Sequence, residues 1–245
     1  MKNVLVIGAT SVIANETAKL IASERGNFFL VGRNEEKLKS VADDLKVRGA
    51  PKADIFVMDL NDCDGHSKLV DGALKSLSRF DIVLIAHGTL PDQTSCALNP
   101  TETIQALHTN AISTISLLTH IANQMEKQKD GCIAVLSSPA GDRGRKSNYI
   151  YGSAKSAVST FLEGLRNRLH ESNVHVLTVK PGFVDTPMTK NMQKGLLWVG
   201  PDVIASGIWE AIRKKRSVVY LPWFWKYIMF MIKCIPESIF VRLSL

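Results

Sequence analysis

A serine, a tyrosine and a lysine between positions 138 and 155 have the types and the spacing that proton transfer needs. Tyr151 and Lys155 are four residues apart, so in a helix both side chains lie on one face, one turn apart. A nearby cation lowers the pKa of a tyrosine from its usual value of about 10. The Ser138 hydroxyl can donate a hydrogen bond to a carbonyl oxygen while Tyr151 protonates it. The set therefore indicates acid-base catalysis, although the spacing alone also fits a half-buried tyrosine beside a solvated lysine.

The composition indicates one domain and excludes several classes of function. With 245 residues and 45% hydrophobic content, the chain can bury a substantial core. The four cysteines form no CxxC pair and have no metal-ligand spacing with histidine, so we expect reduced thiols and no metal site. The chain begins without the apolar core of a signal peptide, which also favours a cytoplasmic location. The formal net charge of +7 suits an anionic partner, but no nucleic-acid motif is present and nucleic acid is not expected.

Apolar runs and amphipathic segments alternate along the chain. Short apolar runs predict strands at 3–7, 28–31, 54–58, 82–86, 132–136 and 217–221. Amphipathic patterns predict a first helix that ends near residue 25 and further helices at 35–48, 63–78, 101–127 and 201–215. This alternation predicts an α/β fold with a single doubly wound, Rossmann-type parallel sheet and helices on both faces. We expect this domain to span residues 1–221, followed by a tail at 222–245.

The first predicted strand is followed by a turn that suits a dinucleotide phosphate. Gly8 allows a tight turn, Thr10 and Ser11 supply hydroxyls, and the next helix directs its amino terminus at the ligand. A plain helix cap is the alternative, because Val12 and Ala14 stand where such turns usually have glycine.

The end of the second predicted strand indicates which nucleotide binds. Arg33 and Asn34 follow this strand, and no acidic residue occurs before Glu35. An arginine here accommodates the 2′-phosphate of NADP, whereas an acidic residue would hold the ribose hydroxyls of NAD. We therefore expect NADP(H), with a solvated loop arginine as the alternative. Asp59 follows the third strand, where it would either bond the adenine amino group or cap the next helix.

Two further polar positions leave alternatives open. His87 and Gly88 follow the fourth predicted strand, where the glycine lets the backbone approach a ligand closely. We expect His87 to be a packed structural residue rather than a catalytic one. Asn110 lies within a predicted apolar helix, so it is either a buried structural group or part of a proton relay.

Together, these motifs resemble the short-chain dehydrogenase/reductase family over about residues 1–221. The motifs that carry the resemblance are Gly8-Ala9-Thr10, Asp59, Ala86-His87-Gly88, Asn110, Ser138, Tyr151-x-x-x-Lys155 and the run from Pro181 to Pro187. The resemblance implies that Ser138, Tyr151 and Lys155 are catalytic and that Asn110 holds a water of the proton relay. It implies that Lys155 also binds the nicotinamide ribose and lowers the pKa of Tyr151. Two motifs depart from the family pattern: the first turn has one glycine instead of three, and Ile85-Ala86-His87-Gly88 replaces Asn-Asn-Ala-Gly.

The same resemblance implies the contacts of the cofactor NADP(H). The expected residues are Gly8, Thr10, Ser11, Val12, Ile13, Arg33, Asn34, Asp59, Leu60, Ala86, His87, Gly88, Tyr151, Lys155, Pro181, Gly182, Val184 and Thr186. The cofactor would supply hydride, and the protein would supply position and electrostatics. The resemblance also implies a homo-oligomer, a dimer or tetramer, formed through the helices that hold Asn110 and Tyr151.

The last part of the chain bears on the substrate. Residues 188–199 are apolar, so we expect either a mobile segment over a bulky hydrophobic substrate or side chains packed on the core. The tail at 222–245 interleaves aromatic and basic residues and is too short to span a bilayer. It suits a membrane interface, with the basic cluster at 213–216 adding attraction to anionic lipid. Contact with the substrate pocket or with another subunit is the alternative.

A looser resemblance links the chain to bacterial reductases such as the decaprenylphosphoryl keto-pentose reductases. It implies a lipid-linked carbonyl or alcohol substrate, such as a keto-sugar. With the tail at a membrane interface, we expect a cytoplasmic protein attached peripherally to the inner face of the membrane. The sequence as a whole predicts an NADP(H)-dependent oxidoreductase that interconverts a ketone and a secondary alcohol. The alternative is a non-catalytic regulatory or scaffold protein that binds nucleotide on the same fold.

Overall fold

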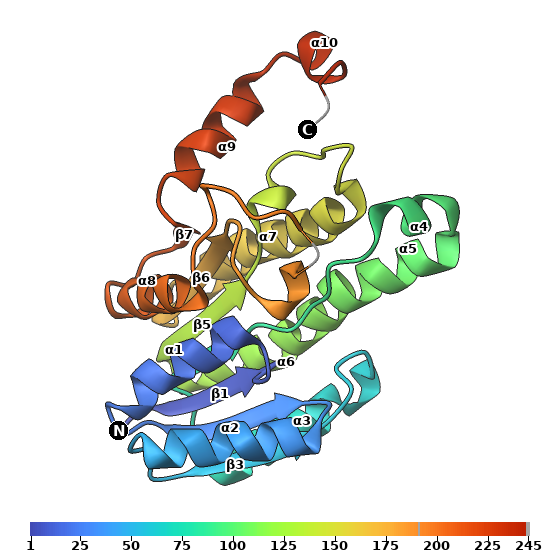
Figure 1. The fold of residues 1–245 in the computed structure, drawn as a ribbon. Coiled ribbons are helices and arrows are strands. Elements are labelled where there is room, and N and C mark those ends of the chain that lie inside the picture. Colours follow the sequence, from blue (N-terminus) through green and yellow to red (C-terminus); the bar gives the residue numbers. More distant parts are fainter. Residues whose placement is uncertain (191, 244–245) are drawn as a thin grey trace.

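A seven-stranded parallel sheet forms the centre of the computed structural model, which describes residues 1–190 and 192–243 (Figure 1). Its strands lie in the order β3-β2-β1-β4-β5-β6-β7. The chain runs outward from β1 to β3 on one side and from β4 to β7 on the other, so the order reverses between β1 and β4. Ligands of such sheets bind outside the carboxyl ends of the strands at this reversal. The strands are β1 (Asn3–Ile7), β2 (Asn27–Gly32), β3 (Ala53–Val57), β4 (Ile82–Ile85), β5 (Gly131–Leu136), β6 (Val174–Pro181) and β7 (Val218–Leu221).

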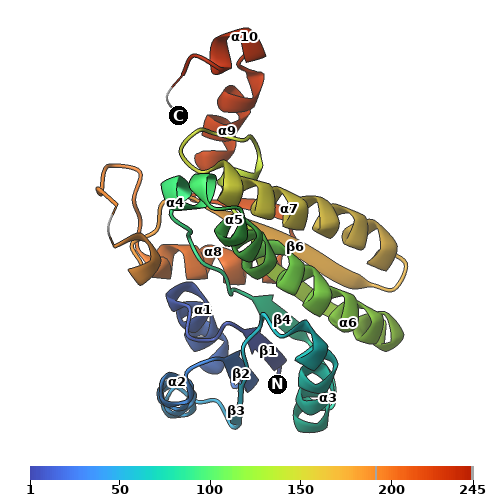
Figure 2. The same cartoon turned by 90° about the vertical axis from the view of Figure 1, so that its right-hand side faces the viewer.

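Helices cover both faces of the sheet, with α1, α2 and α8 on one face and α3, α6 and α7 on the other (Figure 2). The short helices α4 and α5 lie beside α7, and α9 and α10 project from the body of the fold at the top of Figure 1. The helices are α1 (Val12–Ala22), α2 (Glu35–Val47), α3 (His66–Leu77), α4 (Gln93–Leu98), α5 (Pro100–Leu107), α6 (Ser113–Gln128), α7 (Tyr149–Leu169), α8 (Pro201–Arg213), α9 (Trp225–Cys234) and α10 (Glu237–Phe240).

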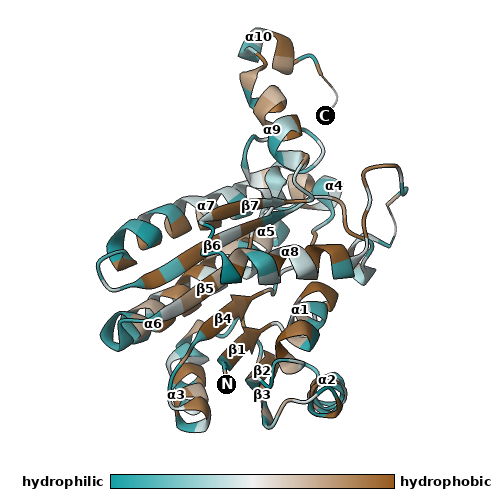
Figure 3. Ribbon diagram, turned by 90° about the vertical axis from the view of Figure 1, so that its left-hand side faces the viewer, coloured by the Kyte–Doolittle hydropathy of each residue, from teal (hydrophilic) through white to brown (hydrophobic). Residues whose placement is uncertain are grey.

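The core consists of two apolar layers, one on each face of the sheet. Successive side chains of a strand point to opposite faces, so Val4 and Val6 contribute to the layer under α1 and α8. Leu5 and Ile7 contribute to the layer under α3 and α6. Because both faces are covered, the strands are mainly hydrophobic, as the brown of β1 and β4 in Figure 3 shows.

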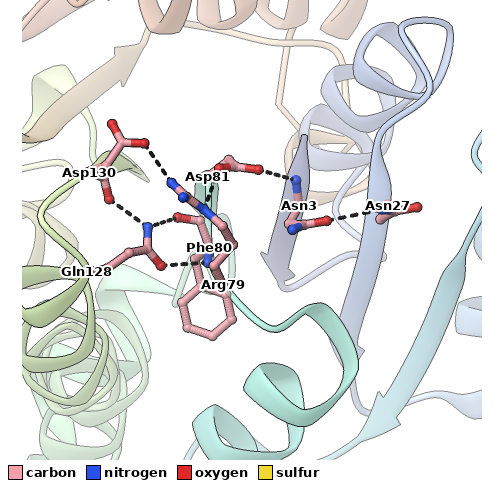
Figure 4. Close-up of polar contacts among 7 residues, drawn as sticks. All are labelled: Asn3, Asn27, Arg79, Phe80, Asp81, Gln128 and Asp130. Carbon is pink, nitrogen blue, oxygen red and sulfur yellow. Dashed lines mark hydrogen bonds and ion pairs between the residues drawn. The ribbon is translucent and has the colours of Figure 1, made fainter. Parts of the chain in front are cut away.

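A polar network fixes the amino ends of the central strands (Figure 4). The Asp81 carboxylate accepts a hydrogen bond of 2.7 Å from the backbone N–H of Asn3, and the Asn27 amide donates to the Asn3 side chain. Arg79 forms ion pairs with Asp81 at 3.0 Å and with Asp130 at 2.6 Å. These contacts tie together the starts of β1, β2, β4 and β5. The opposite edge, where the carboxyl ends of the strands meet, is left for a ligand.

The predicted fold class is confirmed, but one predicted helix is interrupted. The segment 101–127 contains α5, a π-helical turn at His108–Ile112, and α6. The Asn110 side chain donates a hydrogen bond of 3.0 Å to the Ala106 carbonyl, so it competes with the backbone for helical acceptors. The predicted helix at 63–78 begins with a 3₁₀ turn, Cys63–Gly65, before α3. Helix α4 was not predicted; it begins where Asp92 accepts a hydrogen bond from the Ser95 backbone N–H.

Candidate active site

A cavity of about 720 Å³ opens at the carboxyl ends of the strands, where their order reverses. All four predicted catalytic residues line it, and so do all the predicted cofactor-binding residues except Asn34. The Asn34 side chain instead accepts a hydrogen bond of 2.8 Å from the Lys37 backbone N–H and caps α2. Asn34 therefore has a capping role in this structure, and its contact with the cofactor stays a prediction.

Tyr151 and Lys155 lie one turn apart near the start of α7, as their spacing predicted. Lys155 is 4% exposed, and its Nζ atom donates a hydrogen bond of 3.0 Å to the Leu136 carbonyl at the end of β5. The buried Ser137 hydroxyl also contacts Ser159 of α7 at 2.7 Å. Helix α7 is thereby fixed against the end of β5, so Ser138, the next residue along, faces the same cavity.

Asn110 enters the site from the π-helical turn. It is fully buried, and its side-chain oxygen accepts a hydrogen bond of 2.9 Å from the Thr89 backbone N–H. Its amide nitrogen donates to the Ala106 carbonyl. Single π-helical turns inside helices are frequent at functional sites. Asn110 therefore connects the loop after β4 to the helix, and it is both a buried structural group and a wall of the cavity.

Burial controls the ionisation of the two titratable residues at the centre of the site. It raises the pKa of Tyr151 to about 12, although the neighbouring Ser138 hydroxyl acts in the opposite direction. It lowers the pKa of Lys155 to about 8. The sequence predicted a lowered tyrosine pKa, and this was wrong for the protein without ligand. The reason is that the loss of hydration outweighs the effect of a cation 5.7 Å from the centre of the phenol ring.

His87 lies in the wall of the cavity as a neutral side chain. Its Nε2 atom is 2.7 Å from the Ser113 hydroxyl, and burial lowers its pKa to about 3. An imidazole with this pKa does not exchange protons near neutral pH. The structural role expected of His87 therefore fits its surroundings.

The residues around β1 and β2 fit a dinucleotide. Gly8 has a φ of +80°, and a Cβ atom there would lie 2.6 Å from the His87 backbone nitrogen, so only glycine permits this turn. Helix α1 begins at Val12, and the side chain of its cap residue Ser11 makes no capping hydrogen bond. The first N–H groups of α1 are therefore free to bind a phosphate. Arg33 is exposed at the end of β2 and forms no ion pair within the described residues.

Asp59 has one interaction that the sequence left open. One carboxylate oxygen accepts a hydrogen bond of 3.0 Å from the Asn61 backbone N–H, so Asp59 stabilises the turn after β3. The residue also lines the cavity. Asp59 therefore does not cap the next helix as the alternative expected, because Asp62 and Gly65 precede the 3₁₀ turn and α3, and the adenine contact stays a prediction.

Residues that the sequence did not single out line the cavity beyond the catalytic set. They include Gln93, Arg145 and Asn148, and Trp225 comes from the tail. No periodic pattern or motif marks them, because they come from the start of α4, from the loop before α7 and from α9. Met188 and Met192 of the predicted substrate segment line the cavity, whereas Leu196 and Leu197 are exposed. Position 191 lies outside the described residues.

The tail packs one side of α9 on the rim of the cavity. Trp225 is 5% exposed, and its indole meets the Phe183 ring edge to face, with 5.1 Å between ring centres. Phe183 stacks on Trp198 from its other side. Met229, one turn after Trp225, is also buried. The pocket-contact alternative for the tail is therefore observed for this side of α9.

Arg143 holds the far end of α9. Its Nη1 atom donates hydrogen bonds to the carbonyl groups of Ile232 at 2.6 Å and Ile235 at 2.7 Å. Its Nη2 atom pairs with Glu237, and the guanidinium lies 3.6 Å from the centre of the Phe240 ring. A cation that bonds the last carbonyl groups of a helix stabilises that helix end. The tail is therefore tied to the loop that precedes α7.

The outer side of α9 remains exposed and apolar. Tyr227 is 59% exposed and Phe230 is 66% exposed, and Trp223 and Met231 are exposed beside them. Within residues 1–190 and 192–243, no helix has the length and apolar character needed to cross a bilayer.

Comparisons with known proteins agree with this geometry. The family model for short chain dehydrogenases matches residues 2–196. An uncharacterised oxidoreductase of Mycobacterium tuberculosis (strain H37Rv) is 31% identical over 240 residues, which cover 98% of this chain and 96% of that protein. A 3-oxoacyl-[acyl-carrier-protein] reductase of Chlamydia muridarum is 29% identical over 195 residues, which cover 80% of this chain and 79% of that protein. The solved structure of levodione reductase superposes with a TM-score of 0.81 at 18% identity and covers 90% of this chain and 95% of its own.

The fold, the residues at the carboxyl ends of the strands and the family match all indicate the same class of protein. The chain belongs to the short-chain dehydrogenase/reductase family and is an oxidoreductase of that family. Members of this family use nicotinamide cofactors. The mycobacterial match includes most of the tail, whereas the match to the acyl-carrier-protein reductase covers only 80% of the chain.

Proposed function

We propose that this protein is an NADP(H)-dependent oxidoreductase that interconverts a ketone and a secondary alcohol. The observation that carries the proposal is that Asn110, Ser138, Tyr151 and Lys155 line one cavity together with a glycine turn and a helix terminus suited to a dinucleotide. When bound, the nicotinamide would supply or accept the hydride. Reduction is the favoured direction because NADPH usually serves reduction.

The chain's own residues then handle the proton. With a pKa of about 12, the Tyr151 phenol is protonated at neutral pH and can donate to the carbonyl oxygen as negative charge develops there. The Ser138 hydroxyl would donate a hydrogen bond to the same oxygen. Lys155 is largely charged at neutral pH, so it favours the phenolate that remains after transfer. Asn110 would hold a water through which Tyr151 regains its proton.

Arg33 supports the preference for NADP(H) over NAD(H). It lines the cavity at the end of β2 and forms no ion pair with any described residue. A free guanidinium suits the 2′-phosphate, which it can bind with two parallel hydrogen bonds.

The tail supports a bulky or lipid-linked substrate, such as a keto-sugar. Trp225 lines the cavity from α9, and the opposite side of this helix exposes Tyr227 and Phe230. Lys226 and Lys233 lie on the same helix, so the outer side combines aromatic and basic residues. Such a surface suits the interface of an anionic membrane, where a lipid-linked substrate would be presented. We therefore propose peripheral attachment through the outer side of α9.

A homo-oligomer is proposed as well. Ile104 on α5 and Ile112 on the π-helical turn are largely exposed, although both are apolar. Ile112 lies on the turn that holds Asn110 and Ile104 on the helix directly before it, which supports contact between copies through this side of the molecule. Light scattering would give the number of subunits.

The direct test is turnover of ketones with NADPH. Purified protein would be incubated with NADPH and a panel of cyclic ketones, keto-sugars and long-chain keto compounds, and the absorbance of NADPH would be followed. The proposal predicts ketone-dependent oxidation of NADPH. If NADPH binds but no ketone or secondary alcohol reacts, and Tyr151→Phe leaves the cellular function intact, the scaffold interpretation is correct.

A further inference from the structure

Several of the residues that line the cavity carry a buried polar atom without a partner. Four such atoms are Nε of Arg145, Nε2 of Gln93, Oδ1 of Asn148 and Nε1 of Trp225, and all four residues line the cavity. Of the two further such atoms within the described residues, Nδ1 of His87 also belongs to a cavity residue, and only Oδ1 of Asn15 does not. An unpaired buried polar group is costly, so such groups in a cavity indicate a ligand that bonds them.

These atoms are held in place by other contacts of their side chains. The Gln93 side-chain oxygen accepts a hydrogen bond of 3.2 Å from the Ile150 backbone N–H, which leaves its NH₂ group free to donate. The Trp225 indole packs on Gly182, where a Cβ atom would lie 1.9 Å from Nε1, so only glycine admits it. Three of the four unpaired groups are therefore N–H donors, two of them fixed by packing or bonding.

Arg145 gives this group of donors a positive charge. Its guanidinium forms no hydrogen bond or ion pair within the described part of the chain. The carboxylate nearest in sequence belongs to Asp142, and it is already bonded by Lys180 at 2.5 Å and by the Tyr220 hydroxyl at 2.7 Å. Burial lowers the pKa of Arg145 and the Asp142 charge opposes this, but an arginine stays protonated in proteins.

The group lies next to the catalytic tyrosine. Asn148 is the cap residue of α7, three residues before Tyr151, and Gln93 bonds the N–H of Ile150, which directly precedes Tyr151. Asp92, beside Gln93, also lines the cavity, but it is exposed and one of its oxygens caps α4. Asn148 and Gln93 are therefore linked to the start of α7, where Tyr151 lies, and Arg145 precedes it in the same loop.

We propose that the substrate carries an anionic group, a carboxylate or a phosphate, and that Arg145 binds it together with the Gln93 amide. This inference rests on the proposed function and specifies its substrate class. A guanidinium binds carboxylate and phosphate oxygens with two parallel hydrogen bonds, and Gln93 and Trp225 supply further donors. Asn148 accepts a hydrogen bond from a hydroxyl group of the same substrate.

The test compares matched charged and neutral ketones. One pair is dihydroxyacetone phosphate and dihydroxyacetone, and the other is 4-oxopentanoate and its methyl ester. Calorimetric titration of each compound into NADP⁺-saturated protein measures binding without turnover, so the result does not depend on the proposed reaction. The bound NADP⁺ also keeps the charged compounds out of the nucleotide phosphate site. Assays with NADPH then give kcat/KM for the same pairs. Comparison of the phosphate pair with the carboxylate pair shows which of the two anionic groups the site binds.

Wild-type protein is expected to bind the charged member of at least one pair about 10- to 100-fold more tightly than the neutral one. Arg145→Gln should remove this preference, Arg145→Lys should retain part of it, and Lys146→Gln, at an exposed neighbouring cation outside the cavity, should leave it unchanged. NADPH binding should be equal in all variants, which shows that they fold. If neither charged probe binds preferentially, or Arg145→Gln affects charged and neutral ligands equally, water fills this region and the inference is wrong. If binding behaves as expected but no ketone reacts, the proposed function fails and the anion site stands.

Discussion

The Nζ atom of Lys155 lies 5.7 Å from the centre of the Tyr151 ring. The lysine residue as a whole is 4% exposed. Its 3.0 Å hydrogen bond goes to the Leu136 carbonyl, so the lysine joins α7 to the end of β5. The charge of Lys155 is therefore held in a site where charge is costly. This cost has a measurable effect on stability.

The free energy of unfolding should depend on pH through Lys155. Its pKa is about 8 in the folded protein and about 10.4 when unfolded, so between these values the unfolded state binds more protons. The penalty is fully present below pH 8 and is relieved as the pH rises towards about 10.4, by about 3 kcal/mol at most. Urea unfolding of wild type and Lys155→Met at pH 7 and pH 10 would measure it. Relative to the variant, the free energy of unfolding of wild type should be higher at pH 10 than at pH 7. An equal difference in unfolding free energy at both pH values would contradict the buried charge.

Cofactor choice should depend on Arg33. Arg33→Ala should weaken NADPH binding by about 10-fold or more and leave NADH binding unchanged, because only NADPH carries the 2′-phosphate. Fluorescence titration of both nucleotides would measure this. Lys37→Ala is the matched control, since Lys37 is an exposed cation on α2 outside the cavity. Equal loss for both nucleotides would mean that Arg33 only supports the loop.

The position of the tail should depend on Arg143. Arg143→Ala removes charge-assisted hydrogen bonds to the end of α9, so the tail should open about 10-fold more often or more. Limited trypsin digestion, which cuts after Lys226 and Lys233, would report this as faster cleavage. Lys146→Ala removes a neighbouring exposed cation and should have no effect. Unchanged cleavage in Arg143→Ala would show that packing of Trp225 and Met229 alone holds the tail.

The exposed side of α9 should bind anionic vesicles. The double variant Tyr227→Glu and Phe230→Glu places charge on this surface and should abolish co-sedimentation with phosphatidylglycerol vesicles. Val47→Glu is the control, because Val47 is an exposed apolar residue on α2 and is 88% exposed. If wild type does not sediment, or the double variant sediments equally, the membrane proposal is wrong. A fall in molecular mass on light scattering of the double variant would assign this side to a second copy of the chain.

Much of the fold follows from local sequence patterns. The apolar run that ends at Gly8 predicts β1 with its observed bounds, because a fully buried strand is apolar on both faces and the glycine ends it. The spacing of Tyr151 and Lys155 places both on one side of α7. The parallel sheet and six of its seven strands follow from the alternation of strands and helices, but β6 (Val174–Pro181) was not predicted.

The details that the sequence does not predict depend on contacts between distant segments. The π-helical turn at Asn110 depends on the side-chain bond to Ala106 and on the loop after β4. The raised pKa of Tyr151 depends on how deeply the assembled site buries it. Trp225 reaches the cavity only because the chain turns back after β7 and α9 packs on Phe183. None of these relations leaves a periodic signal in the sequence.

The central claim is that Tyr151 is the proton donor of a ketone reductase, and one comparison tests it most directly. NADPH-dependent ketone reduction would be measured for wild type and Tyr151→Phe, with NADPH binding measured in parallel. The account predicts that the variant binds NADPH as wild type does but loses about 10²- to 10⁴-fold in kcat, because the phenol hydroxyl alone is removed. A variant that retains wild-type kcat would contradict the assignment of Tyr151 as the acid.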